Sequence, residues 1–251
     1  KQLSGKVVLL ITECLYAELH QKMPSESVAR QMLREVMLET HSKGKGMIVT
    51  TFSSHIARLK SVIEFGKKLN RKIIFMGRSL DKYVTAAESI GLVNFTKDIG
   101  QILYGKRAER MLKKISKEKE KYLLVMTGHQ GEPKAMLSRI VNGKFKFNLD
   151  QGDSVIFSCH TIPTPTTMAN RKMLEEQLAE RGVRIFMDIH VSGHAAHEDL
   201  RELIEMVAPH HIIPNHGEPR MLAALADLAA KMGYKHEHVH ILFNGQRLKI
   251  G

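Results

Sequence analysis

The feature that most constrains the fold of this chain is a regular alternation of short apolar segments with longer amphipathic ones. A short run of Val, Ile and Leu is typical of a strand buried on both faces, and the amphipathic stretches between such runs indicate helices. Strands that alternate with helices form βαβ units with right-handed crossovers. The sequence therefore predicts an α/β fold with a mainly parallel sheet flanked by helices. The apolar segments cover residues 6–12, 47–51, 72–76, 93–95, 122–127, 154–158, 183–189, 211–214 and 238–243.

The composition limits the class of protein. Of the 251 residues, 43% are hydrophobic and 25% are charged, which excludes a disordered or collagen-like chain. No window approaches the roughly 18 apolar residues that a membrane span needs. Cys14 and Cys159 lack a C-x-x-C spacing, which favours a reducing, cytoplasmic location. The formal net charge of +12 favours a polyanionic partner through counterion release, without identifying it.

Five loops that follow the expected strands carry the unusual residues. In parallel sheets, functional groups gather at the carboxyl ends of the strands, in the loops that lead to the next helix. Glycine beside a polar side chain lets backbone N–H groups approach an anion or a metal-bound oxygen. The loops read TEC at residues 12–14, GRS at 77–79, TGHQGE at 127–132, SGH at 192–194 and NHGE at 215–218.

His194 and His216 each lie next to a glycine, between an expected strand and an expected helix. If the two histidines follow successive parallel strands at equivalent positions, both imidazoles would point into one crevice at the carboxyl edge of the sheet. Neutral imidazole is a ligand for Zn²⁺ or Mn²⁺, and a second imidazole can donate a proton to a leaving oxygen. Glu13 could hold such a His in its donating state through a hydrogen bond to the other ring nitrogen. From the residues alone, a functional and a structural role for these histidines stay equally open.

Two other patterns favour ordinary explanations. His236, His238 and His240 have period-two spacing, which places them on one face of a strand, and an exposed edge strand is favoured over a metal site. Residues 106–121 are heavily charged, and a solvated helix or loop is favoured there over a ridge that contacts RNA.

Longer strings of residues resemble a known family. They occur in the expected order over nearly the whole chain, and together they resemble the β-CASP branch of the metallo-β-lactamase superfamily, within it the archaeal ribonuclease J group. The strings are TGHQGEP at 127–133, LSR at 137–139, IPTP at 162–165, ANR at 169–171, VSGHA at 191–195, PNHGE at 214–218 and NGQRL at 244–248.

The resemblance implies a role for each candidate residue. Glu13 looks like the acidic motif A, His194 like the motif B histidine near the scissile phosphate, and His216 like the motif C histidine, a ligand to one of two catalytic zinc ions. The implied reaction is hydrolysis of RNA phosphodiesters by a metal-bound hydroxide, from 5′ to 3′ on RNA with a 5′ monophosphate. Ser192 and Gly193 would line the phosphate pocket together with His194.

Further RNA contacts are expected from Arg78, Ser79 and Arg139, because a guanidinium pairs with phosphate in a bidentate manner. The resemblance also divides the chain. Residues 1–19 and 189–251 would belong to a split metallo-β-lactamase domain with an αββα arrangement, and residues 20–188 would form the β-CASP domain.

One part of the family pattern is not found in this sequence. The metal-binding motif H-x-H-x-D-H does not occur, so the chain resembles the C-terminal portion of a longer protein. His216 alone gives one ligand where a stable zinc site takes roughly three or four. We therefore expect no tight binding of a catalytic metal pair and little nuclease activity by this chain alone. Exposed strand edges would favour a homodimer.

Alternatives of other classes remain. One is an endonuclease of the type that processes mRNA 3′ ends, which the SGHA string at motif B disfavours. Another is a non-catalytic RNA-binding protein that has lost its metal-binding half. A nucleotide-binding α/β protein would carry a G-x-G-x-x-G or Walker loop after the first strand, and TEC at residues 12–14 is neither.

Overall fold

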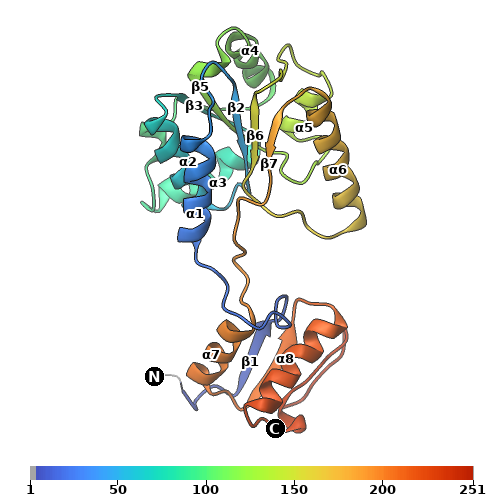
Figure 1. Cartoon of the computed structure of the whole chain (residues 1–251). Helices are drawn as coiled ribbons and strands as arrows, with labels where there is room; N and C mark the ends of the chain where they lie inside the picture. Colours follow the sequence, from blue (N-terminus) through green and yellow to red (C-terminus); the bar gives the residue numbers. More distant parts are fainter. Residues whose placement is uncertain (1–3, 251) are drawn as a thin grey trace. The chain divides into compact units, whose positions relative to one another are not determined.

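The computed structural model describes residues 4–250, and these residues form two compact units (Figure 1). We name them unit 1, which combines the residues up to Pro24 with those from Ser192 onward, and unit 2, which is Ser25–Val191. Within the described residues, no helix is both long enough and apolar enough to cross a membrane.

Unit 2 contains a six-stranded sheet in the order β4-β3-β5-β2-β6-β7, and every neighbouring pair of strands is parallel. This confirms the predicted mainly parallel sheet. β2 and β6 are buried along their whole length, as expected for strands covered on both faces. The strands are β2 (Met47–Thr50), β3 (Lys72–Met76), β4 (Gln101–Leu103), β5 (Tyr122–Met126), β6 (Ser154–Phe157) and β7 (Arg184–Phe186).

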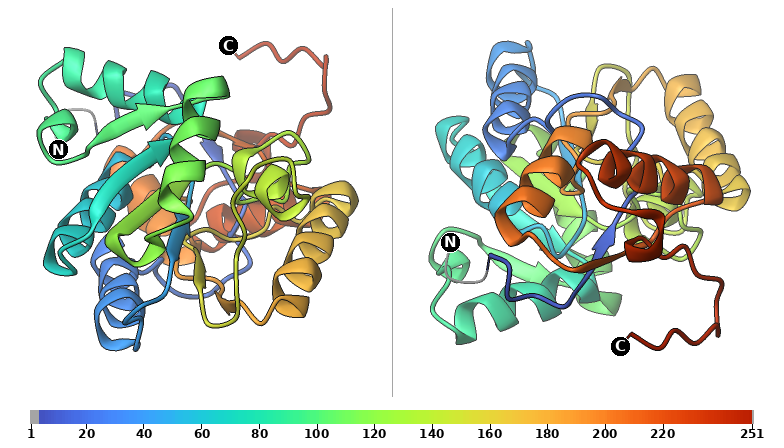
Figure 2. Two further views of the ribbon diagram at one scale, coloured as in Figure 1. Left: turned by 90° about the horizontal axis from the view of Figure 1, so that it is seen from above. Right: turned by 90° about the horizontal axis from the view of Figure 1, so that it is seen from below.

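Helices cover both faces of this sheet (Figure 2). Alternate residues of β5 point to opposite faces: Leu123 packs into the apolar core with the first three helices, and Leu124 packs into the core with the next three. The carboxyl ends of the strands therefore remain open to the connecting loops. The helices are α1 (Glu26–Arg34), continued by one looser turn at Glu35–Glu39, α2 (Ile56–Lys68), α3 (Arg78–Ser89), α4 (Gly105–Ile115), α5 (Met136–Val141) and α6 (Pro165–Glu180).

Unit 1 joins the two ends of the chain. β1 (Leu9–Glu13) pairs in parallel with β8 (His211–Asn215), although they lie far apart in the sequence. α7 (His197–Val207) and α8 (Pro219–Lys231) contribute Leu200, Ile204, Leu225 and Leu228 to a shared apolar core. This core fixes the carboxyl ends of β1 and β8, from which functional side chains can extend.

The structure corrects several predicted segments. The strand predicted at residues 238–243 is wrong: a short helical turn at His236–His238 precedes an irregular segment whose one described ladder contact is the bridge between Ile212 and Val239. The apolar piece at residues 93–95 leads into a turn at Phe95–Lys97, and the strand of this region is β4, further along the chain. An alternating apolar pattern does not make a strand without a partner to complete the ladder.

The charged stretch after residue 105 forms α4, with Ala108, Leu112 and Ile115 buried and its charged side chains on the other face. This agrees with the predicted solvated helix. A short turn at Lys119–Lys121 then leads into β5.

Lowering the pH is expected to destabilise unit 2 through His190. Burial, then the nearby positive charge of Arg58, lowers the pKa of His190 from 6.5 to about 4, and its Nδ1 has no hydrogen-bond partner among the described residues. Because this pKa is lower in the folded than in the unfolded chain, the unfolded chain binds more protons between these two values. Stability is therefore lost as the pH falls through that window, by at most about 2 kcal/mol at pH 5.

Urea unfolding at pH 7 and at pH 5 measures this effect. Other groups also titrate over this range, so the measured quantity is the difference between the wild type and His190→Gln. The loss of stability should be smaller in the variant. An identical loss in both proteins would contradict the assignment.

Candidate functional site

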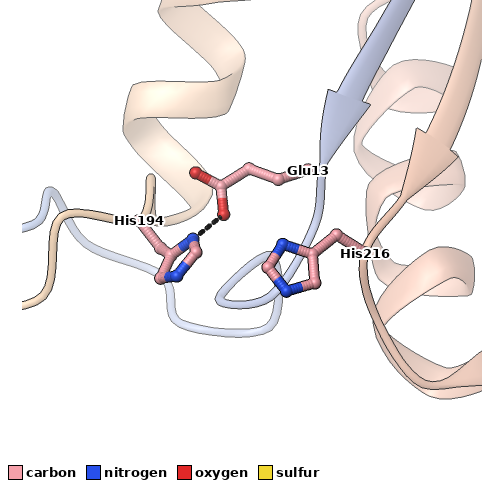
Figure 3. Close-up of side chains that lie close together, drawn as sticks. All are labelled: Glu13, His194 and His216. Atoms are coloured by element: carbon pink, nitrogen blue, oxygen red, sulfur yellow. Dashed lines mark hydrogen bonds and ion pairs between the residues drawn. The ribbon is translucent and has the colours of Figure 1, made fainter.

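Three of the sequence-predicted residues lie together in unit 1: Glu13, His194 and His216 (Figure 3). Each offers one potential ligand atom, and these atoms all lie within 4.8 Å of one another. The imidazole centroids of His194 and His216 are 5.2 Å apart, with their planes at 70°. One small group, such as a phosphate, could therefore contact both rings.

The pairing of β1 with β8 explains how two of these residues meet. In the parallel register Glu13 lies opposite Asn215, so His216 follows directly at the same edge. The φ angle of His216 is 55°, a left-handed conformation that is uncommon outside glycine and is often found at functional sites. Gly217 allows the turn, because a Cβ there would lie 2.6 Å from the Sγ of Cys14.

Glu13 fixes the orientation of His194. One carboxylate oxygen of Glu13 contacts the Nδ1 of His194 in a short hydrogen bond, and the other accepts from the backbone N–H of Ala195 at 3.0 Å. The hydrogen bond expected between Glu13 and a histidine is therefore present. With Nδ1 donating to the carboxylate, Nε2 is the free ring nitrogen of His194.

The loop that carries His194 is also held by its own polar groups. Ser192 Oγ accepts a hydrogen bond from the N–H of His194 at 3.1 Å, and Asp199 at the start of α7 accepts from Ala196 at 3.0 Å. Gly193 is open: apart from Gly193 itself and its two neighbours in the chain, no atom of the described residues lies within 4 Å of the position that a Cβ would occupy. Its backbone is therefore accessible to a ligand.

One detail of the predicted geometry is wrong. His194 does not follow a strand that neighbours β8, because β7 belongs to the sheet of unit 2 and the chain enters unit 1 only at Ser192. His194 instead lies in the loop before α7. The residue that shares a sheet edge with His216 is Glu13, and its carboxylate brings His194 to the same place.

The remaining predicted contacts lie in unit 2. Arg78, Ser79 and Arg139 line one cavity of about 360 Å³, together with Lys134. Ser79 Oγ is hydrogen-bonded to Ser53 Oγ at 2.9 Å, and the guanidinium of Arg139 lies 4.5 Å from the centroid of the Phe145 ring. The start of α3, which follows β3, and α5, which follows β5, thus bring these residues together.

Sequence reasoning did not predict that three histidines gather at the carboxyl edge of the same sheet, although it singled out the loop at 127–132 that contains His129. His160 and His190 have ring centroids 4.8 Å apart, Asp188 is hydrogen-bonded to His160 at 2.7 Å, and His129 packs against Phe52 at 4.4 Å. The signal was present, because each of these histidines lies shortly after β5, β6 or β7 in the sequence.

The histidines near the C-terminus form a contact of another kind. His211 Nδ1 and His240 Nε2 are 3.0 Å apart, and the ring of His238 also contacts His211. Within residues 4–250, the group that satisfies the distances for three metal ligands is Glu13 with His194 and His216. The edge strand expected at His236, His238 and His240 is wrong, because these residues lie in a short helical turn and the irregular segment after it.

The donor set of the unit 1 site suits zinc. Imidazole nitrogen and carboxylate oxygen are both ligands that Zn²⁺ accepts. Both oxygens of Glu13 already accept hydrogen bonds from the His194 loop, so this carboxylate is better placed to orient His194 than to bind an ion. The ring of His216 is exposed and therefore accessible to an ion.

Comparison with known protein families first identifies the class of protein to which this chain belongs. A family model described as "Ribonuclease J, beta-CASP domain" matches residues 44–175. A second, described as "Zn-dependent metallo-hydrolase RNA specificity domain", matches residues 180–242. The protein is thus of the metallo-hydrolase class that carries a β-CASP domain.

Curated relatives then give the family. The chain is 43% identical over 246 residues to ribonuclease J of Pyrococcus abyssi, which covers 97% of this chain and 54% of the relative. It is 44% identical over 248 residues to ribonuclease J of Methanocaldococcus jannaschii, and the match covers 97% of this chain and 55% of the relative. Ribonuclease J 1 of Streptococcus pyogenes is 30% identical over 249 residues, and the match covers 97% of this chain and 42% of the relative. This chain belongs to the ribonuclease J family, which confirms the resemblance seen in its motifs.

The chain spans about half the length of the archaeal relatives it matches. The activity of the whole protein is therefore treated below as a proposal.

Proposed function

We propose that this chain provides the RNA-binding surface and part of the catalytic centre of a zinc-dependent ribonuclease that degrades RNA from its 5′ end. The observation that carries the proposal is the convergence of Glu13, His194 and His216 within 4.8 Å. The family match to ribonuclease J and the net charge of +12 support RNA as the substrate.

The proposed roles follow from the hydrogen bonds. Glu13 holds the Nδ1 side of His194, so that the Nε2 side faces the substrate and donates a proton to the leaving oxygen. The open backbone at Gly193 binds a phosphate oxygen. His216 would be a ligand to zinc, which when bound supplies a Lewis acid and an activated water at neutral pH.

The zinc affinity of this chain alone is expected to be low. His216 gives one free imidazole, whereas a stable zinc site takes roughly three or four protein ligands. We also propose that unit 1 corresponds to the metallo-β-lactamase segments at residues 1–19 and 189–251, and unit 2 to the β-CASP segment at residues 20–188. Two sub-micromolar zinc sites in a calorimetric titration of this chain would contradict the expectation of weak binding.

Other parts of the proposal concern partners and location. A 5′ monophosphate is the proposed signal on the RNA, bound by the loop of Ser192 and Gly193. A homodimer is favoured by Val8 and Ile11 of unit 1, whose exposed fractions are 56% and 58%. Both cysteines are free and buried, which is compatible with the proposed cytoplasmic location.

A chimera tests the proposed activity. In it, this chain replaces the matching segment of the Pyrococcus abyssi relative. With zinc, the folded chimera should release mononucleotides from the 5′ end of a single-stranded RNA, and faster when that end carries a monophosphate than when it carries a hydroxyl. This chain alone should release far less. A folded, zinc-loaded chimera that leaves the RNA intact would refute the proposed function.

A further inference from the structure

A groove with several positive charges crosses one edge of unit 2. It consists of two cavities of about 360 and 420 Å³ that share Lys134 and Arg139 in their lining. Arg78 lines the first cavity and Lys144 lines the second. Among the described residues, no carboxylate lines either cavity. We name this feature the Lys134 groove.

The four cations of the Lys134 groove are available to a ligand. Within residues 4–250, none of them forms a salt bridge, whereas many other basic residues of unit 2 do, such as Lys119 with Asp150. Arg78, Lys134 and Lys144 are exposed, and Arg139 is partly buried against Phe145. Packing on this ring restricts the guanidinium and so lowers the entropy that it loses on binding an anion.

The backbone adds further positive potential to the groove. α3 begins at Arg78 and α4 begins at Gly105, and both residues line the first cavity. Neither helix has a side-chain cap on its first N–H groups. Helix N-termini carry partial positive charge and offer these N–H groups to anions. Asp81 lies in the first turn of α3 but does not line the groove.

Glycine permits this arrangement of the backbone. The φ angle of Gly77 is 149°, and a Cβ there would lie 2.6 Å from the Cγ2 of Thr127. β3 and β5 can therefore end side by side, with the start of α3 directly above them.

An exposed aromatic ring indicates what kind of anion fits. Tyr104 is 46% exposed and lines the first cavity. Proteins that bind single-stranded nucleic acid combine a basic groove for the backbone with aromatic side chains on which bases stack. Several separate cations along one groove match consecutive phosphates better than a single free phosphate.

We propose that the Lys134 groove is an RNA-binding subsite of unit 2, which holds successive phosphates of single-stranded RNA and stacks one base on Tyr104. The proposal rests on the proposed function, because it takes RNA as the substrate. It adds Lys134, Lys144 and Tyr104 to the contacts predicted from sequence, and it places Arg78 and Arg139 in the same groove.

Fluorescence anisotropy with a labelled single-stranded oligouridine, over a range of KCl concentrations, tests the subsite in the intact chain. The variant Lys134→Gln/Arg139→Gln/Lys144→Gln removes three phosphate contacts. The slope of log affinity against log salt should then fall by about 2, and affinity should fall on the order of 100-fold at about 0.1 M salt.

The matched control removes the same charge elsewhere in unit 2. Lys113, Lys114 and Lys117 are exposed at the far end of α4, make no salt bridge among the described residues and line neither cavity of the groove. Lys113→Gln/Lys114→Gln/Lys117→Gln should lower the affinity by less than about 5-fold. An equal loss in both triple variants would overturn the subsite, because non-specific charge would then explain binding.

A third variant tests the stacking contact. Tyr104→Ala should weaken binding about 10-fold without changing the salt slope, and Tyr104→Phe should restore it. Wild-type affinity and slope in the groove triple would overturn the subsite but leave the proposed function standing. A wild-type chain that binds no RNA at low salt would overturn both.

Discussion

Replacing His194 by alanine in the chimera is expected to lower kcat for RNA hydrolysis by about 10²–10⁴-fold, the range that a positioned general acid contributes. The free Nε2 of His194 is the group proposed to donate a proton to the leaving oxygen. Because this interaction develops in the transition state, KM should change little. Initial rates of release of labelled nucleotide, measured over a range of RNA concentrations, give both constants.

Glu13 should act only through His194. Glu13→Gln removes the negative charge that stabilises the protonated ring, and partners of this kind are typically worth about 10–100-fold. The double variant Glu13→Gln/His194→Ala should then be no slower than His194→Ala alone, because residues that act as one unit are not additive. Multiplicative losses would contradict a positioning role for Glu13.

The matched control for these variants is Glu18→Gln. Glu18 is a partly exposed carboxylate of unit 1 that forms a surface ion pair with Arg220, and it is not part of the group of potential metal ligands. This variant should keep nearly the full rate, since exposed ion pairs contribute little. A rate as low as that of Glu13→Gln would show that the loss reflects charge or stability and not the site.

The sheet of unit 2 could be predicted because its central strands are buried on both faces. β2, β3, β5 and β6 lie in short apolar runs of strand length, which are typical of strands covered on both faces. β4 has only three residues, begins with Gln101 and lies at the edge of the sheet, so it has no such signal.

The residues of the candidate site could be predicted from the sequence, but their arrangement in space could not. Glycine beside histidine drew attention to His194 and His216, and the loop after the first expected strand drew attention to Glu13. The alternation of strands and helices continues without interruption through residues 183–197, however, so no local pattern reveals that the chain leaves one sheet and joins the other unit at Ser192. Only the long-range pairing of β1 with β8 fixes which residues meet.

The Lys134 groove shows a different limit. Arg78 was recognisable from its strand-exit loop and Arg139 from the LSR string at 137–139, but Lys134 and Lys144 look like ordinary surface lysines in the sequence. Their significance depends on the absence of carboxylates around two shared cavities, which is a property of the folded surface.

An ion pair with a fully buried cation connects elements near the carboxyl edge of unit 2. Arg58 of α2 is fully buried, and its guanidinium donates to both oxygens of Glu26 at 2.7 Å. The same guanidinium donates to the carbonyl of Ile189 at 2.8 Å. Burial alone would raise the pKa of Glu26, but the hydrogen bonds and charge of Arg58 lower it below its ordinary value. One side chain thus connects α1, α2 and the segment that follows β7.

Replacing Arg58 by methionine is therefore expected to lower the free energy of unfolding by about 3 kcal/mol, the lower end of the cost of removing one partner from a buried pair, because Glu26 is 31% exposed and water can solvate it in part. Arg30→Met is the matched control, because Arg30 also donates to both oxygens of a glutamate, Glu64, but that pair is exposed. Its loss should cost at most about 1 kcal/mol. Urea unfolding followed by circular dichroism measures both values.

Removing the second charge as well, in Arg58→Met/Glu26→Leu, should recover part of the stability, because no unpaired carboxylate then remains. Equal costs for Arg58→Met and Arg30→Met would contradict a structural role for the buried pair.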